Sequence, residues 1–376
     1  MLCYIHVPFC TRKCAYCAFA SQVPRAGDMQ AYVDALLQEI AIQGDRLGRR
    51  TISTLYFGGG TPSLLPAKVV EVVFRRLRRA FRIAPDAEIT LEANPESVTA
   101  HHLHDLVSLG VNRVSIGLQA MDDESLGLLG RCHTARQGLA AAHNARMAGV
   151  QNLSLDLIWG RPGQRLKTWL DELRQVVSLR PEHLSCYSLT VEPGTPLETL
   201  CLARTLALPD EEEQGKMFVY GSEYLEGEGY LHYEISNFAR LGFQSRHNTG
   251  YWEGRDYLGL GPSAVSTLEG RRWANPETLA AWVEAVRTDT LGQDAEPLTL
   301  EQRLTELVML RLRTSRGLNL RGYRRLAGVS FTQQHAAKIQ ALSRRELIRI
   351  HGGYLRLSRE GWLVADAILT NLITDG

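Results

Sequence analysis

The stretch Tyr4-Ile-His-Val-Pro-Phe-Cys10-Thr-Arg-Lys-Cys14-Ala-Tyr-Cys17 places three cysteines within eight residues. It overlaps a short apolar segment, Cys3–Val7, which we expect to form a strand that ends just before the first of these cysteines. Three thiolates leave one iron of a [4Fe–4S] cluster without a protein ligand, whereas an electron-transfer cluster normally has four cysteines. The spacing therefore indicates a cluster held by Cys10, Cys14 and Cys17, with one iron open to a substrate or cofactor. A zinc site, which usually has four ligands in paired spacings, and unligated thiols are the alternatives.

The composition is that of a protein with a substantial core. The 376 residues are 44% hydrophobic and carry a net charge of +1, which predicts no nucleic-acid or membrane partner for the chain as a whole. No apolar run approaches the ~20 residues of a membrane helix, and the N-terminus lacks the features of a signal peptide. We therefore expect a cytoplasmic protein. In a reducing compartment, cysteines crowded at the start of the chain indicate metal ligation or redox chemistry rather than disulfides.

Short apolar runs alternate with amphipathic segments up to about residue 235. The alternation predicts parallel strands with helices outside, either as a doubly wound sheet or as an incomplete (β/α) barrel. We favour a partial (β/α)6 barrel, because polar groups at the ends of several strands are typical of barrel sites. The expected strands are Cys3–Val7, Ile52–Phe57, Glu88–Ala93, Arg113–Leu118, Leu153–Ile158 and Leu184–Thr190. The expected helices are 28–40, with Asp28 as N-cap, and 66–81, 101–109, 134–147, 164–179 and 209–227.

After about residue 235 the regular alternation of short apolar runs and amphipathic segments ends. The segment 236–275 is rich in Gly, Asn, Tyr and Trp and predicts loops with short strands, followed by a helix over 276–286. From residue 298 the pattern predicts helices over 298–313, 319–327 and 332–343, a hairpin at Gly352-Gly353 and a final helix over 360–372. This order resembles a winged-helix module. We expect three parts: a core over 1–235, a connecting region over 236–297 and a small helical domain over 298–376.

The cysteine motif resembles the CxxxCxxC loop of radical S-adenosylmethionine (SAM) proteins, and in particular the branch that contains oxygen-independent coproporphyrinogen III oxidase. The resemblance implies a [4Fe–4S] cluster whose open iron is chelated by SAM, and a partial (β/α) barrel, which agrees with the strand pattern. It also implies that the glycine-rich loop after the second strand holds the SAM methionyl amine. That loop is Gly58-Gly59-Gly60-Thr61, and Gly59, Gly60 and Thr61 are the expected binding residues.

Other polar residues at strand ends and in nearby loops match the SAM-binding set of the same branch. Carboxylates and amides suit the ribose hydroxyls of SAM, and an arginine suits its carboxylate. Each residue taken singly could equally cap a helix or pair with a neighbour. The resemblance implies SAM binding by Glu92, Gln119, Arg131 and Asp156, with Tyr4 and Tyr16 beside the cluster.

Two features separate the chain from the oxidase. The oxidase continues its loop to CxxxCxxCxC, whereas Ala18 and Phe19 follow Cys17 here, and only three residues precede Tyr4. The motif His247-Asn-Thr-Gly-Tyr-Trp resembles the HNxxYW signature of the heme chaperone (HemW) branch, which implies heme binding with His247 as a candidate axial ligand. By its chemistry alone, a histidine near Tyr and Trp is more often packed or hydrogen-bonded.

The resemblance implies a heme chaperone that delivers heme to apoproteins such as respiratory enzymes. The alternative is a radical SAM oxidoreductase, like the oxidase, that acts on a tetrapyrrole. We expect no coproporphyrinogen oxidase activity, while cleavage of SAM stays open.

The C-terminal part is strongly basic. Residues 298–376 hold 13 Lys/Arg and 6 Asp/Glu, a net charge of +7, so residues 1–297 carry −6. A basic winged helix can bind nucleic acid. We favour instead a docking or lid role, in which the positive charge attracts heme propionates, an acidic partner or, transiently, an anionic membrane surface.

Overall fold

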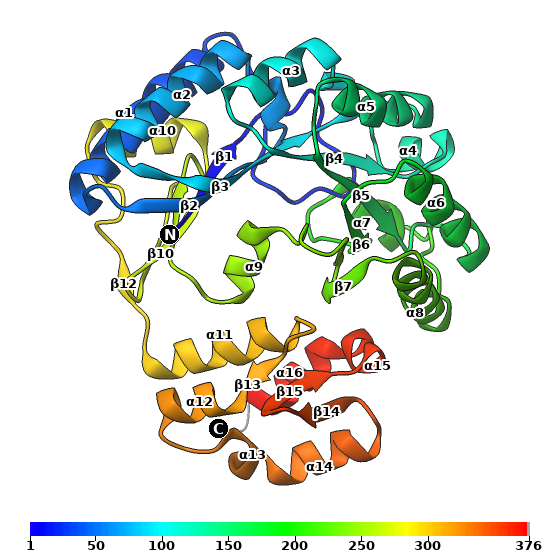
Figure 1. Cartoon of the computed structure of the whole chain (residues 1–376). Coiled ribbons are helices and arrows are strands. Elements are labelled where there is room, and N and C mark those ends of the chain that lie inside the picture. The colour runs from blue at the N-terminus through cyan, green and yellow to red at the C-terminus, as the bar shows by residue number, and fades with distance from the viewer. Residues whose placement is uncertain (374–376) are drawn as a thin grey trace.

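Six parallel strands follow one another in the order of the chain in the computed structural model, which describes residues 1–373 (Figure 1). Each pairs with the next along its length. A doubly wound sheet reverses its strand order at a switch point, whereas these six strands run in one direction of the sheet without reversal. The predicted partial (β/α)6 barrel is therefore confirmed. Its strands are β1 (Leu2–Val7), β2 (Thr51–Gly59), β3 (Arg82–Ala93), β4 (Arg113–Gln119), β5 (Asn152–Trp159) and β6 (His183–Ser188).

Helices cover the outer face of this sheet (Figure 1). The long ones are α1 (Asp28–Leu47), α2 (Ala67–Ala80), α3 (Ala100–Leu109), α5 (Ala135–Met147), α6 (Leu166–Ser178) and α8 (Glu211–Gly227). The prediction of Asp28 as N-cap of α1 was wrong by one residue. Gly27, with φ of 91°, takes that place, because the carboxylate of Asp28 accepts from the backbone N–H of Arg25 and from Gln22 Nε2. The short helices α4 (Asp123–Leu128) and α7 (Pro196–Leu202) were not predicted.

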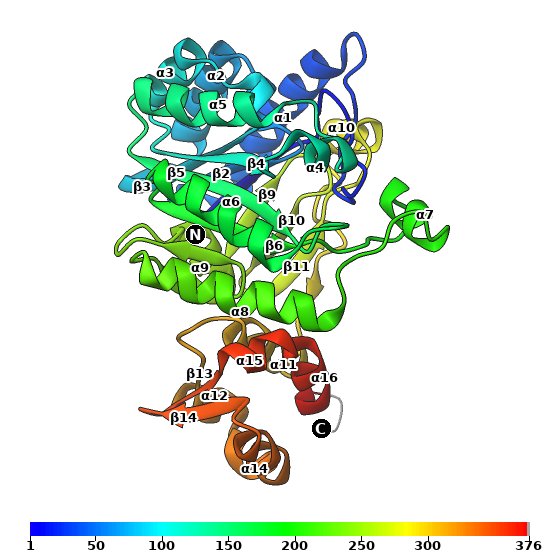
Figure 2. The same ribbon diagram turned by 90° about the vertical axis from the view of Figure 1, so that its right-hand side faces the viewer.

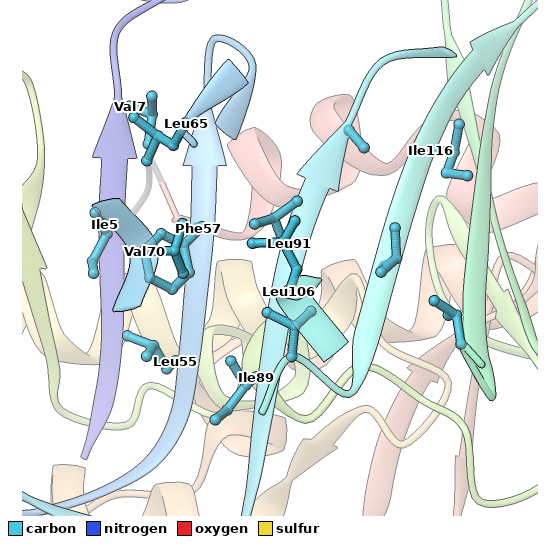
Figure 3. Close-up of a cluster of buried hydrophobic side chains, with 14 of the residues drawn as sticks. Ile5, Val7, Leu55, Phe57, Leu65, Val70, Ile89, Leu91, Leu106 and Ile116 are labelled. Atoms are coloured by element: carbon cyan, nitrogen blue, oxygen red, sulfur yellow. The ribbon is translucent and has the colours of Figure 1, made fainter. Parts of the chain in front are cut away.

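The main hydrophobic core lies between the strands and these helices. In β2, Leu55 and Phe57 point outward into the core, whereas Thr54 and Tyr56 bond to groups inside the barrel. The barrel interior is thus polar, and the outer layer supplies the apolar burial, at about 1.5–3 kcal/mol for each large side chain. Figure 3 shows part of this layer, including Ile5, Val7, Leu55, Phe57, Leu65, Val70, Ile89, Leu91, Leu106 and Ile116.

Further strands extend the sheet at both edges. Parallel β9 joins β1, and antiparallel β8 joins β6, so that the barrel stays open. A short helix that was not predicted, α9 (Arg246–Trp252), lies on the concave side of the sheet (Figure 1). The remaining elements are β7 (Leu231–Glu234), β8 (Asn237–Ala239), β9 (Tyr257–Leu260), β10 (Val265–Leu268), β11 (Arg271–Ala274), α10 (Leu279–Arg287) and β12 (Glu296–Pro297).

The last part of the chain packs beneath the barrel, with α8 above it (Figure 2). Gly352 and Gly353, both with positive φ, turn the predicted hairpin. Together with a third strand, the hairpin and helices have the winged-helix arrangement. The predicted helices 332–343 and 360–372 are each divided in two. The elements are α11 (Leu300–Leu312), β13 (Leu318–Asn319), α12 (Leu320–Ala327), α13 (Phe331–Gln334), α14 (Ala336–Arg344), β14 (Ile348–His351), β15 (Tyr354–Leu357), α15 (Arg359–Leu363) and α16 (Ala365–Ile373).

The barrel and the C-terminal part each have a large hydrophobic core. One gathers side chains from Cys3 to Leu291, and the other from Val308 to Leu372. A division of the chain near residue 298 remains our proposal, as does the boundary at 235, across which the sheet continues from β7 to β8. Among the helices formed by residues 1–373, none has the length and apolar character needed to cross a membrane.

Candidate cofactor site at the carboxyl ends of the strands

The cysteine loop begins where Pro8 ends β1. Two backbone hydrogen bonds close it at its base, from Cys10 N–H to Gln22 O (3.0 Å) and from Gln22 N–H to Pro8 O (2.7 Å). Ala15 ties the loop to its surroundings, donating to Leu129 O and accepting from Leu197 N–H. The thiols of Cys10, Cys14 and Cys17 are free and partly exposed. The fold therefore carries the three predicted ligands on one loop that is closed at its base.

The glycine loop at the end of β2 lies directly under the cysteine loop. Gly60 N–H donates to Val7 O (2.8 Å), and a Cβ at Gly60 would stand 2.5 Å from Phe9 O and 3.0 Å from Cys10 Sγ. Gly59 has φ of 111°, which few other residues adopt. Thr61 Oγ1 donates to Cys10 Sγ at 3.6 Å. Of the predicted residues, Gly60 and Thr61 thus lie beside the first cysteine, and Gly59 lies against the His6 ring.

Arg131 brings positive charge to the same place. Its Nη1 donates to Cys14 Sγ (3.5 Å), and its Nη2 donates to Asn94 Oδ1 (2.6 Å) and Gly117 O (3.0 Å). Burial acts to lower the pKa of Arg131, but the nearby Tyr16, Cys14 and Glu96 act in the opposite direction, and the pKa of Arg131 is raised overall. Asn94 also donates to Thr61 Oγ1 (2.9 Å), so this residue, which was not predicted, joins the arginine to the glycine loop.

Glu92 on β3 and Tyr4 on β1 stand on the two strands that flank β2. Glu92 accepts from Tyr56 OH (2.6 Å) and from Gly59 N–H (3.2 Å), and its surroundings raise its pKa to about 7, chiefly through burial. Tyr4 OH bonds to His6 Nδ1, and His6 Nε2 bonds to Ala20 O in the cysteine loop. Tyr4 and Glu92 are partly exposed, so both can meet a molecule in the barrel mouth.

Gln119 and Asp156 complete the predicted set on the other side of the mouth. Gln119 lies at the end of β4 with φ of 66°, and its Oε1 has no hydrogen-bond partner. Asp156 accepts from Ser115 Oγ (3.0 Å) and from Ser154 Oγ (3.2 Å), while burial raises its pKa. All the residues predicted to bind SAM are partly exposed except Thr61.

His247 occupies a different position. It is 1% exposed inside the barrel, where its Nδ1 bonds to Thr54 Oγ1 (2.8 Å) and its ring lies 4.9 Å from that of Tyr56. Burial lowers its pKa to about 3, so the imidazole is neutral, and its Nε2 has no partner. In this conformation a heme iron outside the barrel does not reach Nε2, because α9 holds the ring inward.

The residues at the mouth fit a cluster and SAM. Three free thiols share one loop, Gly60 lets the glycine loop approach that loop closely, and two buried polar atoms, Gln119 Oε1 and Arg131 Nε, have no partner. Within the described residues 1–373, no three Cys, His, Asp or Glu side chains group around a point that could hold a single metal ion. Ligation requires thiolates, and Arg131 favours that form at Cys14, although burial raises the pKa of both Cys14 and Cys17.

Comparisons with known proteins agree with this geometry. The radical SAM superfamily model matches residues 4–176, and the HemN C-terminal domain model matches residues 298–364. The chain is therefore a radical SAM protein with a HemN-type C-terminal domain.

Curated relatives named Heme chaperone HemW narrow this class. The one from Bacillus subtilis is 31% identical and covers 97% of both chains, and the one from Synechocystis is 36% identical over 90% of this chain and 82% of its own. The solved structure of Escherichia coli coproporphyrinogen III oxidase (HemN), described as a radical SAM enzyme, has a TM-score of 0.83 at 25% identity, covering 99% of this chain and 90% of its own. Within the radical SAM superfamily, the chain belongs to the HemW family.

Proposed function

We propose that this protein is a cytoplasmic heme chaperone that binds heme and delivers it to heme-requiring apoproteins, such as respiratory enzymes. The observation that carries the proposal is the likeness, over 97% of the chain, to a relative named Heme chaperone HemW. The basic C-terminal part supports transient association with an anionic membrane surface, where the charge of +7 would be attracted. Nucleic acid is not part of the proposal.

The protein carries, in this proposal, a [4Fe–4S] cluster ligated by Cys10, Cys14 and Cys17, with SAM on the open iron. When bound, the cluster would supply electrons, and Cys10, Cys14 and Cys17 would hold it with one iron open to SAM. Arg131 would add the positive charge that a SAM carboxylate requires, and the backbone of Gly59 and Gly60 would bind the methionyl amine. Glu92, Gln119 and Asp156 surround the mouth with acceptors for ribose hydroxyls, and Tyr4, Tyr16 and Thr61 pack beside the loop.

The test combines cluster, heme and transfer in one sample. The anaerobically reconstituted protein is titrated with heme, and the loaded protein is then mixed with an apo-oxidase whose recovered activity reports transfer. We expect stoichiometric heme binding and activation of the oxidase. Absence of heme binding, or binding without transfer, overturns the proposal.

His247 as the axial ligand is a separate part of the proposal. Since His247 is 1% exposed, ligation requires α9 to withdraw from the barrel. The His247→Ala variant is titrated alongside the wild type, and loss of the heme absorption spectrum of the wild type would support ligation. An unchanged spectrum removes the ligand assignment and leaves the chaperone function standing.

The match to the oxidase structure favours a second candidate, a radical SAM oxidoreductase acting on a tetrapyrrole. This chain differs from the oxidase at the cysteine loop. Ala18 and Phe19 follow Cys17 here, whereas the oxidase continues to a fourth cysteine. Incubation with coproporphyrinogen III, SAM and a reductant distinguishes the two candidates. We expect no decarboxylated product, whereas product with stoichiometric 5′-deoxyadenosine would establish the oxidoreductase.

A further inference from the structure

A cleft of about 830 Å³ lies between the barrel and the C-terminal winged helix. Its upper wall is the end of α9 with β9 and β10, and its lower wall is α11, which runs beneath them (Figure 1). Tyr257 in this wall pairs with Leu2 at the start of β1, whereas Cys10 follows the end of that strand. The cleft is therefore at the end of the barrel opposite the cysteine loop. Its volume is in the range of small-molecule sites.

The cleft exposes large apolar side chains that a closed surface would cover. Val265 is 38% exposed, Leu300 52%, Met309 36% and Leu326 51%, and all four line this one cleft. They come from three different elements, β10, α11 and α12, so the fold gathers them. Apolar side chains collected in a hollow mark a binding surface more often than those scattered singly.

Arginines without a carboxylate partner stand beside this apolar surface. Arg272 pairs with Glu306, Arg313 pairs with Asp366, and Arg255 pairs with Glu253. In the described part of the chain, Arg303 and Arg311 make no ion pair. Arg311 donates only to Glu253 O (3.2 Å), and burial together with Arg316 and Arg255 lowers its pKa despite the opposing charge of Glu253. Two guanidinium groups on α11 are thus available to an anion.

Aromatic rings of the His247-Asn-Thr-Gly-Tyr251-Trp252 motif form the upper wall. Tyr251 and Trp252 line the cleft, and the Tyr251 ring meets Tyr257 edge-on at 4.7 Å. On its other side Tyr251 contacts the His247 ring, also edge-on, at 4.7 Å. The motif therefore spans the barrel wall, with its histidine inside and its aromatic end in the cleft.

We propose that this cleft is where heme binds. The inference rests on the proposed function and adds to it the location of the site. An apolar planar macrocycle lies against Leu300, Met309 and Leu326, below the rings of Trp252 and Tyr257. Its two carboxylates lie on the guanidinium groups of Arg303 and Arg311, which prefer this planar anion. Heme satisfies both requirements at once, whereas an acidic protein segment uses only the charge.

The test compares heme with heme dimethyl ester, which keeps the macrocycle but lacks the carboxylates. Full-length wild type and the Arg303→Glu/Arg311→Glu variant are titrated with each. We expect the variant to bind heme about tenfold more weakly or worse, since charge-assisted hydrogen bonds are lost, and to bind the ester within about twofold of wild type. Arg344→Glu/Arg345→Glu, on exposed residues of the same module outside the cleft, is the matched control and should change neither affinity.

A second variant fills the cleft. Leu326→Trp should weaken the binding of both heme and ester, while Leu241→Trp, at a residue 81% exposed elsewhere, should weaken neither. Unchanged thermal midpoints show that the variants are folded. If the wild type binds heme and both cleft variants bind it equally well, the cleft assignment is overturned and the chaperone function stands. If the cleft variants lose transfer to the apo-oxidase while their heme affinity is unchanged, the cleft assignment is overturned as well. The cleft is then identified as the surface that docks an acidic partner. No heme binding by the wild type refutes the proposed function itself.

Discussion

Gly60 marks the point where the cysteine loop and the glycine loop come closest. A Cβ there meets backbone, at 2.5 Å from Phe9 O, rather than the flexible end of a side chain. Because backbone cannot turn aside, any larger residue must displace the segment that carries Cys10. The identity of this one residue therefore controls the spacing between the cluster ligands and the loop expected to hold SAM.

The Gly60→Ala variant should lose iron and SAM binding together. We expect a loss of unfolding free energy of about 1–3 kcal/mol from overpacking, and several-fold lower iron content after reconstitution. Gly227→Ala is the control, because a Cβ there meets nothing within 4 Å, and it should be neutral or slightly stabilising. Iron analysis and SAM titration of both variants provide the measurement. Equal iron content in the two would contradict the steric argument.

Glu39 makes stability depend on pH. It is fully buried on α1 and accepts from Gly261 N–H, Asn275 Nδ2 and Trp282 Nε1, and burial raises its pKa to about 8 from a usual value of 4.5. The folded chain therefore holds this proton more tightly than the unfolded chain. The free energy of unfolding should fall as pH rises from about 4.5 to about 8, by an amount on the order of a few kcal/mol.

The Glu39→Gln variant removes this proton. The side-chain amide of the glutamine places an N–H donor against the donors of Gly261, Asn275 and Trp282. We therefore expect the variant to have a lower free energy of unfolding than wild type at pH 5.5, and the difference to become smaller towards pH 8.5. Urea unfolding at several pH values measures the free energy of unfolding of wild type and variant. The exposed Glu277→Gln change should leave the pH profile unaltered, and parallel profiles for wild type and Glu39→Gln would show that Glu39 does not titrate in this range.

At the scale of elements, α9 is held in the barrel by one carboxylate. Glu88 on β3 accepts the backbone N–H groups of Arg246 and His247, each at 2.9 Å. These are N–H groups of the first turn of α9, which have no partner within the helix. Together with the His247–Thr54 bond and the Tyr251–Tyr257 ring contact, Glu88 fixes where the aromatic end of the motif lies.

Replacing Glu88 by Ala should loosen α9 without unfolding the barrel. We expect a loss of about 1–3 kcal/mol for two buried N–H groups left without an acceptor. Hydrogen exchange of a peptide covering 244–256 should become faster. Glu71→Ala, at an exposed position on α2, serves as the control. Exchange that is equally slow in wild type and Glu88→Ala would mean that α9 is fixed by packing alone.

The six strands and most of the long helices could be predicted from apolar periodicity, because each contains enough residues to show its period. Helix α9 could not, since seven residues make fewer than two turns. Cys10, Cys14 and Cys17 were identified by spacing along the chain. Tyr56 was missed, because an inward polar side chain on a barrel strand has the same pattern as one facing solvent, and Asn94 was missed because it lies in the loop that follows β3. Only the pairing of the strands and the packing of the loops at their ends bring them to Glu92 and Arg131.

For the molecule as a whole, His232 lies where the two cores meet. Its ring stacks on Phe238 of the barrel at 4.0 Å and meets Trp362 of the C-terminal part edge-on at 4.6 Å. Burial lowers its pKa to about 3 from a usual value of 6.5. Between these values the unfolded chain binds the proton and the folded chain does not, so the stability that His232 contributes is lost as pH falls below about 6.5.

The His232→Phe variant should resist acid better than wild type. The phenyl ring keeps the stacking and cannot be protonated, so its unfolding free energy should fall less between pH 6.5 and 4. Urea unfolding across this range provides the measurement, with the exposed His104→Phe as control. If acid destabilises wild type and His232→Phe to the same extent, protonation of His232 is not what weakens the junction.

The closure of the cysteine loop at its base separates the expected cluster from the rest of the fold. Because Gln22 bonds to both Pro8 and Cys10 through backbone, the loop is a side branch between β1 and α1, and none of its three thiols belongs to a hydrophobic core. We therefore expect oxidative loss of the proposed cluster to leave these cores intact, so that iron and sulfide can be restored without refolding the chain.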